Sequence, residues 1–395
     1  MSDISKKDKV VILGLGGAGG RIVQQLSKLP ASKDLNLCVF DTDSRALAKL
    51  DGIAENSRIL CDEQWLRGQG TGGDVMKGQR AISRESSKLQ ELMLDASLLI
   101  LTGGLGGGTG TGGAGVICNR ARSHNLTVVS LFELPFSFEG HGRNKTAEDG
   151  LRELLSLSDT VLSIPNDLLF SVLPAETAFS DAFRMADEEI ARTILGVVDV
   201  LSPGNLLSAD IGDLSAILRG RKSYAAVGVG IGNCPTAAGS CVEALAKLMD
   251  SPFLGGAAKL QEADAVILNL TGGTALTVAD VQRTLEHAGS LPGAGAKVLA
   301  GANVDDRMLN EVHITAIAVK YDEREAAAPA ASVEKSSRRR TRSPRRSAEP
   351  PVQQMLPLTI ASSGIFEGKT PTIIDGVNFD IPAFVRRQVN IDIGE

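Results

Sequence analysis

The sequence predicts an α/β protein: a Rossmann-like parallel-sheet domain, a long connecting helix, a second, smaller α/β domain and a disordered C-terminal tail. Three observations predict this fold class. Short apolar runs alternate with stretches of helical spacing, glycine-rich stretches directly follow two of the apolar runs, and the composition changes abruptly after Tyr321. Strands that alternate with helices are typical of a doubly wound, mostly parallel sheet.

The strands of the first domain are predicted from short, mainly apolar runs, of which Val10–Leu13 is continuous, as is typical of a strand buried on both faces. They are Val10–Leu13, Leu37–Phe40, Ser97–Thr102, Thr127–Leu131 and Thr160–Ile164, with a helix predicted over Ile22–Leu29. From about Phe179 to Leu201 the helical spacing is long, which predicts a helix that connects two domains. The second domain has predicted strands at Ala225–Ile231, Ala265–Leu270, Lys297–Ala300 and Val312–Val319, and predicted helices at Cys241–Met249 and Val278–His287.

Composition bounds the function classes. The chain has 395 residues, enough for two domains and further segments. Its net charge of −6 argues against a protein that grips nucleic acid over its whole surface. The five cysteines lack C-x-x-C spacing, so buried reduced thiols are predicted rather than a zinc site. No signal region and no apolar run of ~18 residues is present, and we predict a cytoplasmic protein.

The segment 324–350 differs from the rest in charge. It holds eight Lys/Arg and three Glu, so its net charge is +8 − 3 = +5. Alanine, proline and serine fill most of the remainder, and such a segment cannot bury enough apolar surface to offset its ordering entropy. We predict a disordered basic linker. It is either a solvated tether or, in the Arg338–Arg346 run, a patch that touches lipid or nucleic acid.

The first glycine-rich stretch, Gly14–Gly19, has the pattern G-x-G-x-x-G between a predicted strand and a predicted helix. Asp41 and Asp43 end the next strand, where a ribose-binding acid would lie. Alone, this pattern favours a dinucleotide site and therefore an NAD-dependent oxidoreductase.

The second stretch, Gly103–Gly113, has eight glycines in eleven positions. Successive amides without Cβ atoms can form an anion-binding nest at a helix start, and Thr109 and Thr111 add hydroxyl donors. No lysine of the Walker type is present. Two such loops at neighbouring strand ends fit a di- or triphosphate better than NAD.

These motifs resemble, in the same order, those of the tubulin/FtsZ GTPase family, and most closely its bacterial FtsZ branch. The matching segments are Asp41–Leu47, Gly68–Asp74, Gly107–Gly112, Pro135–Gly140 with Arg143, Ile164–Asp167, and Ala182–Phe183 with Asp187. The resemblance runs from about Val10 to Val319 and resumes in the tail. It implies a GTPase that binds GTP and GDP with Mg²⁺, without assigning protein ligands to the metal.

The resemblance also implies the nucleotide site. Glu139 and Arg143 would contact the ribose and nucleotide, Phe183 would stack on guanine, and Asp187 would read the guanine edge. The remaining implied contacts are Gly16, Gly17, Ala18, Arg21, Asp43, Thr71, Gly72, Gly106, Gly107, Gly108, Thr109, Gly110, Thr111 and Asn166.

Residues Asn205–Asp213 resemble the family's synergy loop. Asp210 and Asp213 lie three residues apart, so at a helix start both carboxylates face the same way. The resemblance implies that they polarise water for attack on the nucleotide of the next subunit, so that hydrolysis requires a head-to-tail filament. Without the resemblance, a capping aspartate followed by an aspartate in the first turn of a helix would be the preferred explanation of the pair.

Three positions depart from the family's usual asparagine: Ser208 in the synergy loop, Asp41 and Arg21. Ser208 can still donate and accept a hydrogen bond, so we expect water positioning, and hence hydrolysis, to be weaker. A nucleotide-dependent filament scaffold with weak or no hydrolysis is therefore an alternative.

The C-terminal end resembles the family's tail peptide, which docks on division-anchor and regulator proteins. Ile381, Phe384 and Val385 have i, i+3, i+4 spacing, typical of a short helix that folds in a partner's groove. The predicted contact residues are Asp380, Ile381, Pro382, Phe384, Val385 and Arg386.

The expected organisation has six parts: an N-terminal arm (1–9), a GTP-binding domain (10–178), a central helix (179–203), an activation domain (204–322), a basic linker (323–376) and a partner-docking peptide (377–395). The expected function is a filament that scaffolds the bacterial division ring, at mid-cell.

Overall fold

The computed structural model describes residues 9–29, 32, 35–168, 176–200, 217, 223–251, 253–321, 373–374 and 377–378. The chain has two compact units, Met1–Ala330 and Ala331–Glu395. In the second unit, β11 (Ile373–Ile374) pairs antiparallel with β12 (Val377–Asn378).

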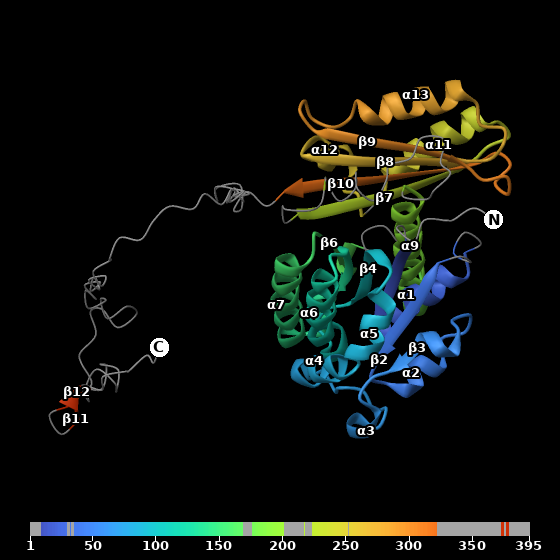
Figure 1. The fold of residues 1–395 in the computed structure, drawn as a ribbon. Coiled ribbons are helices and arrows are strands. Elements are labelled where there is room, and N and C mark those ends of the chain that lie inside the picture. Colours follow the sequence, from blue (N-terminus) through green and yellow to red (C-terminus); the bar gives the residue numbers. More distant parts are fainter. Residues whose placement is uncertain are drawn as a thin grey trace, which may run out of the picture. The chain divides into compact units, whose positions relative to one another are not determined.

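The N-terminal half of the first unit is a six-stranded parallel sheet in the order β3-β2-β1-β4-β5-β6 (Figure 1). The strands are β1 (Lys9–Leu15), β2 (Asn36–Asp41), β3 (Arg58–Leu60), β4 (Ala96–Gly104), β5 (Thr127–Leu134) and β6 (Thr160–Pro165). This is the strand order of the doubly wound nucleotide-binding fold, whose ligand crevice lies outside the carboxyl ends of the strands where the order reverses. The predicted Rossmann-like domain is confirmed, and only the short strand β3 was missed.

The C-terminal half continues the same sheet with β7 (Ser223–Asn233), β10 (Glu311–Tyr321), β8 (Ala265–Gly272) and β9 (Lys297–Val304). Strand β10 is antiparallel to both its neighbours, β7 and β8. A single residue pair, Val161 and Tyr224, joins β6 to β7. The predicted second α/β block is therefore present, as an extension of the first sheet.

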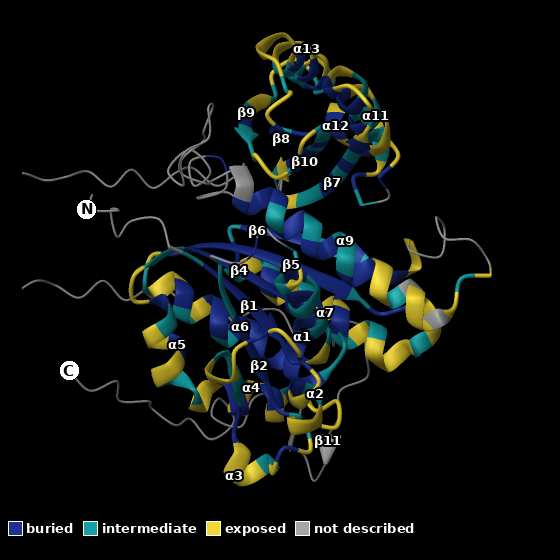
Figure 2. Ribbon diagram, turned by 90° about the vertical axis from the view of Figure 1, so that its right-hand side faces the viewer, coloured by how far each residue is buried: buried dark blue, intermediate teal, exposed yellow. Residues whose placement is uncertain are grey.

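The long helix α9 (Phe179–Val200) packs between the two halves (Figure 2). Its apolar side chains, such as Ile190 and Ile194, share one core cluster with Ile12 of β1 and with Ile267 and Ile317 of the C-terminal strands. Burial against both halves explains why the apolar spacing continues over the whole helix. The predicted connecting helix is confirmed.

The remaining helices cover the faces of the sheet. They are α1 (Gly16–Ser27), α2 (Ser44–Ala48), α3 (Glu63–Leu66), α4 (Val75–Arg84), α5 (Ser86–Met93), α6 (Gly108–Ser123), α7 (His141–Leu157), α11 (Ala237–Met249), α12 (Gly256–Gln261) and α13 (Val278–Gly289), with short 3-10 turns at η2 (Glu55–Ser57) and η3 (Ser137–Glu139). Two further core clusters lie beneath them. No helix in the described part of the chain is long and apolar enough to cross a membrane.

The interpretation of Gly103–Gly113 as one long glycine loop is wrong. Strand β4 includes Gly103 and Gly104, and α6 begins at Gly108, so only three residues form the connection. The helical glycines pack against α4: a Cβ on Gly112 would overlap the Val75 carbonyl oxygen, and one on Gly108 would lie 2.5 Å from the Asp74 carbonyl oxygen. Glycine is needed there because the two helix backbones touch.

The first glycine stretch is also partly helical, since α1 begins at Gly16 and not near Ile22. A Cβ on Gly14 would lie 2.5 Å from the carbonyl oxygen of Gly19, and one on Gly19 would lie 2.5 Å from that of Thr102. These glycines therefore let α1 start directly on the ends of β1 and β4, as in the dinucleotide fold.

Several expectations concern residues outside the described ranges. They are the catalytic residues Ser208, Asp210 and Asp213, the linker up to residue 372, and the docking residues 380–386. The cysteines are all free; Cys38, Cys61, Cys118 and Cys241 are buried and Cys234 is partly exposed.

Candidate nucleotide site

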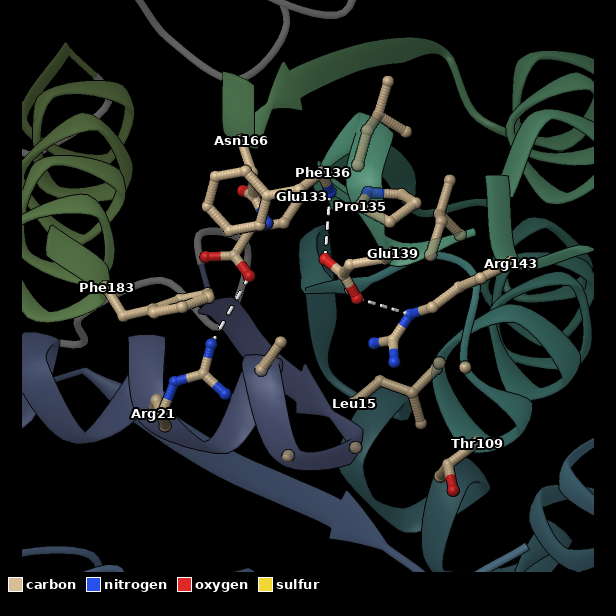
Figure 3. Close-up of a pocket in the computed structure, with 18 of the residues that line it drawn as sticks. Leu15, Arg21, Thr109, Glu133, Pro135, Phe136, Glu139, Arg143, Asn166 and Phe183 are labelled. Atoms are coloured by element: carbon tan, nitrogen blue, oxygen red, sulfur yellow. Dashed lines mark hydrogen bonds and ion pairs between the residues drawn. The ribbon is translucent and has the colours of Figure 1, made fainter. Parts of the chain in front are cut away.

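A cavity of about 560 Å³ lies at the carboxyl ends of β1, β4 and β5, where the strand order reverses (Figure 3). Its size is that of a typical small-ligand site. It gathers eleven of the predicted binding residues from five separate segments: Gly16, Gly17, Ala18, Arg21, Gly107, Thr109, Gly110, Glu139, Arg143, Asn166 and Phe183.

One end of the cavity is formed by the first turns of α1 and α6. The N-cap residues of these helices, Leu15 and Gly107, make no side-chain hydrogen bond to the first-turn amides. Gly16 has a positive φ of 68°, and its Cβ position lies 3.5 Å from the Gly110 nitrogen. Two uncapped helix N-termini thus converge, and their free amides and dipoles favour an anion such as a phosphate.

The two threonines of α6 hold this end in shape. The Thr111 hydroxyl accepts a hydrogen bond of 2.9 Å from the Gly106 amide, and the hydroxyls of Thr109 and Thr42 are 2.7 Å apart. Gly106 has a φ of +92°, and its Cβ would meet Arg143 Cγ at 2.8 Å. These contacts fix the loop that the sequence predicted to wrap phosphates.

The Gly68–Gly73 loop lies next to this end without lining the cavity. The Thr71 hydroxyl touches the Cβ position of Gly108, at the first residue of α6. Gly72 has a φ of +62° and open space around its Cβ position. Asp43 caps α2: its side chain accepts from the Arg45 amide at 2.9 Å and from the Ala46 amide. Although its partial burial opposes the shift, these two hydrogen bonds lower the pKa of Asp43.

The side of the cavity facing α7 carries Glu139 and Arg143, while Asn166, which directly follows β6, lies near Glu133 (Figure 3). Glu139 accepts from the Phe136 amide at 2.9 Å through Oε1 and pairs with Arg143 Nε at 2.9 Å through Oε2. Asn166 is buried, and its Oδ1 has no hydrogen-bond partner within the described part of the chain. Carboxylate, guanidinium and amide groups here suit hydroxyl and phosphate groups of a ligand.

The opposite end combines an aromatic ring with a charged cluster. Phe183 packs edge-on against Phe136, with ring centroids 5.4 Å apart, and the Arg21 guanidinium lies 5.7 Å from the Phe183 ring centre. Arg21 Nε donates to Asp187 Oδ2 at 2.9 Å, and Arg21 Nη2 is 3.5 Å from Glu133 Oε2. Asp187 does not line the cavity, although the resemblance predicts it as a base contact.

The pKa values of both carboxyl groups in this cluster are raised. Burial, followed by the charge of Asp187, raises the pKa of Glu133 to about 8, although Arg21 opposes the shift. Burial also raises the pKa of Asp187, again against the effect of Arg21. Two carboxyl groups and one guanidinium group share this end, so one of the carboxyl groups holds a proton near neutral pH.

Sequence reasoning missed eight lining residues, which are Leu15, Gly104, Leu105, Glu133, Leu134, Pro135, Phe136 and Phe138. Glu133 is the most consequential because it is charged and buried. Its place near the end of β5, where ligands of parallel sheets bind, was the available signal.

Family comparison matches residues 9–174 to the Tubulin/FtsZ family, GTPase domain, and residues 223–322 to the FtsZ family, C-terminal domain. Among solved structures, FtsZ of M. jannaschii (an empty dimer) is 26% identical, with a TM-score of 0.71 over 80% of this chain and 88% of the other.

Two more distant structures share the fold. CetZ1 of Haloferax volcanii, a GDP-bound monomer, is 19% identical, with a TM-score of 0.65 over 78% of this chain and 93% of the other. CetZ2 of the same organism, a GTPγS-bound protofilament, is 20% identical, with a TM-score of 0.64 over 80% of this chain and 95% of the other.

Proposed function

The chain belongs to the tubulin/FtsZ family of GTPases, and from that premise we propose that it binds GTP and GDP in this cavity and hydrolyses GTP in head-to-tail filaments. The observation that carries the proposal is the convergence of the uncapped N-termini of α1 and α6 on one cavity. This arrangement suits a polyphosphate, because each helix start supplies amide donors and a positive dipole end.

The remaining lining residues suit the nucleoside. Glu139 can accept from ribose hydroxyls, Arg143 can move from Glu139 towards a phosphate, and the Phe183 ring offers an apolar face to a base. In this pose the phosphates lie at α1 and α6 and the base lies beside α9.

Hydrolysis needs an acid that this cavity does not provide. Among its described lining residues the only carboxylates are Glu139, paired with Arg143, and Glu133, beside Arg21. We assign water activation to Asp210 and Asp213 of a second copy, with Ser208 helping to position the water. A head-to-tail contact between identical copies does not close, and it therefore extends into a filament.

Magnesium would be held chiefly by the nucleotide. The described residues contain no group of three acidic, histidine or cysteine side chains able to bind a metal ion, and Mg²⁺ commonly uses phosphates and water as ligands. When bound, it would neutralise charge that builds up on the phosphates.

We further assign the filament to the bacterial division ring at mid-cell. Supporting this assignment are the match to the FtsZ C-terminal domain and the tail peptide around Phe384 that resembles the family's docking motif. The tail would recruit division-anchor and regulator proteins, and the basic run Arg338–Arg346 would touch anionic lipid or nucleic acid, or serve only as a tether.

The experiment that tests the function compares GTP with GDP. Light scattering and pelleting measure assembly, and phosphate release measures hydrolysis. We expect GTP-dependent assembly accompanied by phosphate release, and neither with GDP. A chain that neither assembles nor releases phosphate with GTP would refute the proposal.

The second candidate, a scaffold with weak hydrolysis, rests on Ser208 at a usual asparagine position. Assembly with little phosphate release would favour this second candidate, provided that Ser208→Asn increases the phosphate release. The oxidoreductase interpretation of Gly14–Gly19 gains nothing from the family match, and we do not propose it.

A further inference from the structure

At the base end of the cavity, the expected base-reading carboxylate is already engaged. Asp187 Oδ2 accepts from Arg21 Nε at 2.9 Å, and Asp187 Oδ1 is 3.5 Å from Arg21 Nη2. Its side chain is only 2% exposed, and Asp187 does not line the cavity. A base that used Asp187 would have to displace Arg21 from its ion pair and leave this buried carboxylate without its partner.

Glu133 has the properties that Asp187 lacks. It lines the cavity from β5, and Figure 3 shows its carboxyl group between Phe183 and Asn166, above the Arg21 guanidinium. Its side chain is 5% exposed, and its Oε1 accepts no hydrogen bond from any N–H or O–H group that the structure describes, although the carboxyl groups of Glu133 and Asp187 form a side-chain hydrogen bond with each other. A buried acceptor without a donor is costly, so a ligand donor at this position stabilises the site.

We propose that Glu133, and not Asp187, is the carboxyl group that reads the N–H edge of the base. Arg21 keeps Asp187 out of this role because the two side chains form an ion pair. The inference rests on the proposed function, because it assigns a contact within the proposed nucleotide site. Glu133 is then a specificity-determining residue: its free oxygen accepts from the 2-amino group or N1–H of a guanine stacked on Phe183.

The assignment links base binding to pH. The charged groups that face Glu133 are Arg21 on α1, Asp187 on α9 and Glu139 on η3, and the pKa of Glu133 is raised to about 8. An N–H donor favours the ionised carboxylate, so a bound base lowers this pKa and releases a proton. Affinity therefore rises as the pH increases from about 6 to about 8.

The test measures diphosphate binding by calorimetry with the full-length, nucleotide-free chain, which avoids assembly. GDP offers the 2-amino and N1–H donors, IDP lacks the 2-amino group, and ADP lacks both. Loss of a hydrogen bond to a charged acceptor costs about ten- to a hundredfold in affinity. We expect Glu133→Met to reduce GDP affinity by about that factor, to reduce IDP affinity less, and to bring the two affinities together.

Asp187→Asn is the matched comparison. The amide oxygen of the new side chain can still accept from Arg21, so we expect the preference for GDP over IDP to remain within about twofold of the unchanged chain. Because the charge of Asp187 contributes to the raised pKa of Glu133, we expect the rise of affinity with pH to remain but to shift to lower pH. Glu133→Gln keeps the shape and a neutral acceptor, and we expect it to abolish the rise with pH. This variant supplies the answer if Glu133→Met does not fold, as judged by circular dichroism.

The outcomes separate the two proposals. If the unchanged chain binds no diphosphate, the nucleotide site itself is wrong, and the inference falls with it. If the unchanged chain prefers GDP and Asp187→Asn removes that preference while Glu133→Met retains it, only the role of Glu133 is overturned. Flat pH dependence in the unchanged chain would also overturn it.

Discussion

At the scale of single residues, Arg143 lines the cavity at a position where its guanidinium group can contact the phosphates of a bound nucleotide. It pairs with Glu139 at 2.9 Å and packs over Gly106, while half of its side chain stays exposed. A guanidinium in this position can turn to a phosphate without leaving a buried charge behind.

Arg143→Ala is therefore expected to lower GTP and GDP affinity by about tenfold or more, because a charge-assisted contact to phosphate is lost. Calorimetry at two salt concentrations measures the loss. Arg152→Ala is the control on the same helix, since Arg152 is exposed and, among the residues that the structure describes, pairs with the exposed Asp149 at 2.9 Å. Equal effects of the two substitutions would contradict the role of Arg143.

Asp41 gives a prediction on stability. It is buried at the end of β2, where Oδ1 accepts from the Thr42 amide at 2.7 Å, and burial raises its pKa to about 6. The folded state thus binds this proton more tightly than the unfolded state, so the free energy of unfolding rises as the pH falls through about 6 towards about 4. At neutral pH the ionised folded form carries the full penalty.

Asp41→Asn keeps the acceptor and removes that charge. We expect the free energy of unfolding to rise by roughly 1–3 kcal/mol near neutral pH and to change little near pH 4, where the proton is bound in the folded state. Denaturant titrations at the two pH values measure the difference. An increase that is the same at both would show that the buried charge is not its cause.

At the scale of elements, the contact between α4 and α6 sets the position of the phosphate end. The two helices approach until a Cβ on Gly112 would overlap the Val75 backbone and one on Gly78 would overlap that of Gly108. Close packing of backbones leaves no flexible side chain to move aside, so any added atom must separate the helices.

Gly112→Ala is expected to lower the free energy of unfolding by about 1–3 kcal/mol and to weaken GDP binding, because the start of α6 moves. Gly142→Ala is the matched control: Gly142 lies in α7 with open space at its Cβ position, and alanine there should be neutral or slightly stabilising. Thermal melts and GDP calorimetry measure both. An unchanged melt for Gly112→Ala would refute the packing role.

At the scale of the whole molecule, the proposed division of labour between two copies can be tested by mixing. Arg143→Ala weakens the nucleotide site and leaves the acids, whereas Asp213→Ala leaves the nucleotide site and removes one acid. Each alone should hydrolyse GTP poorly.

Mixed in equal amounts, they should regain part of the activity, because a contact between the Asp213→Ala nucleotide site and the acids of the other variant is complete. Phosphate release measures the gain over the sum of the separate rates. Activity equal to that sum would show that each copy completes its own site.

The fold and much of the site could be predicted because their signals are local. A buried strand, a glycine pair and a helix start are consecutive in Val10–Gly20 and again in Ser97–Thr111, and each motif keeps its meaning without knowledge of distant residues. Eleven of the predicted binding residues accordingly line one cavity, although their contacts with a nucleotide stay predictions. The catalytic acids and docking peptide stay predictions as well.

By itself, the sequence determined the α/β class, the mostly parallel, doubly wound sheet and the family. Only the tertiary structure decided that the second glycine run is a helix-packing surface and that Arg21 holds Asp187 beside Glu133. Arg21 lies 112 positions from Glu133 and 166 from Asp187, and no periodicity or motif relates such distances. Their meeting depends on how α1, β5 and α9 pack, since packing alone brings distant charges into one buried cluster.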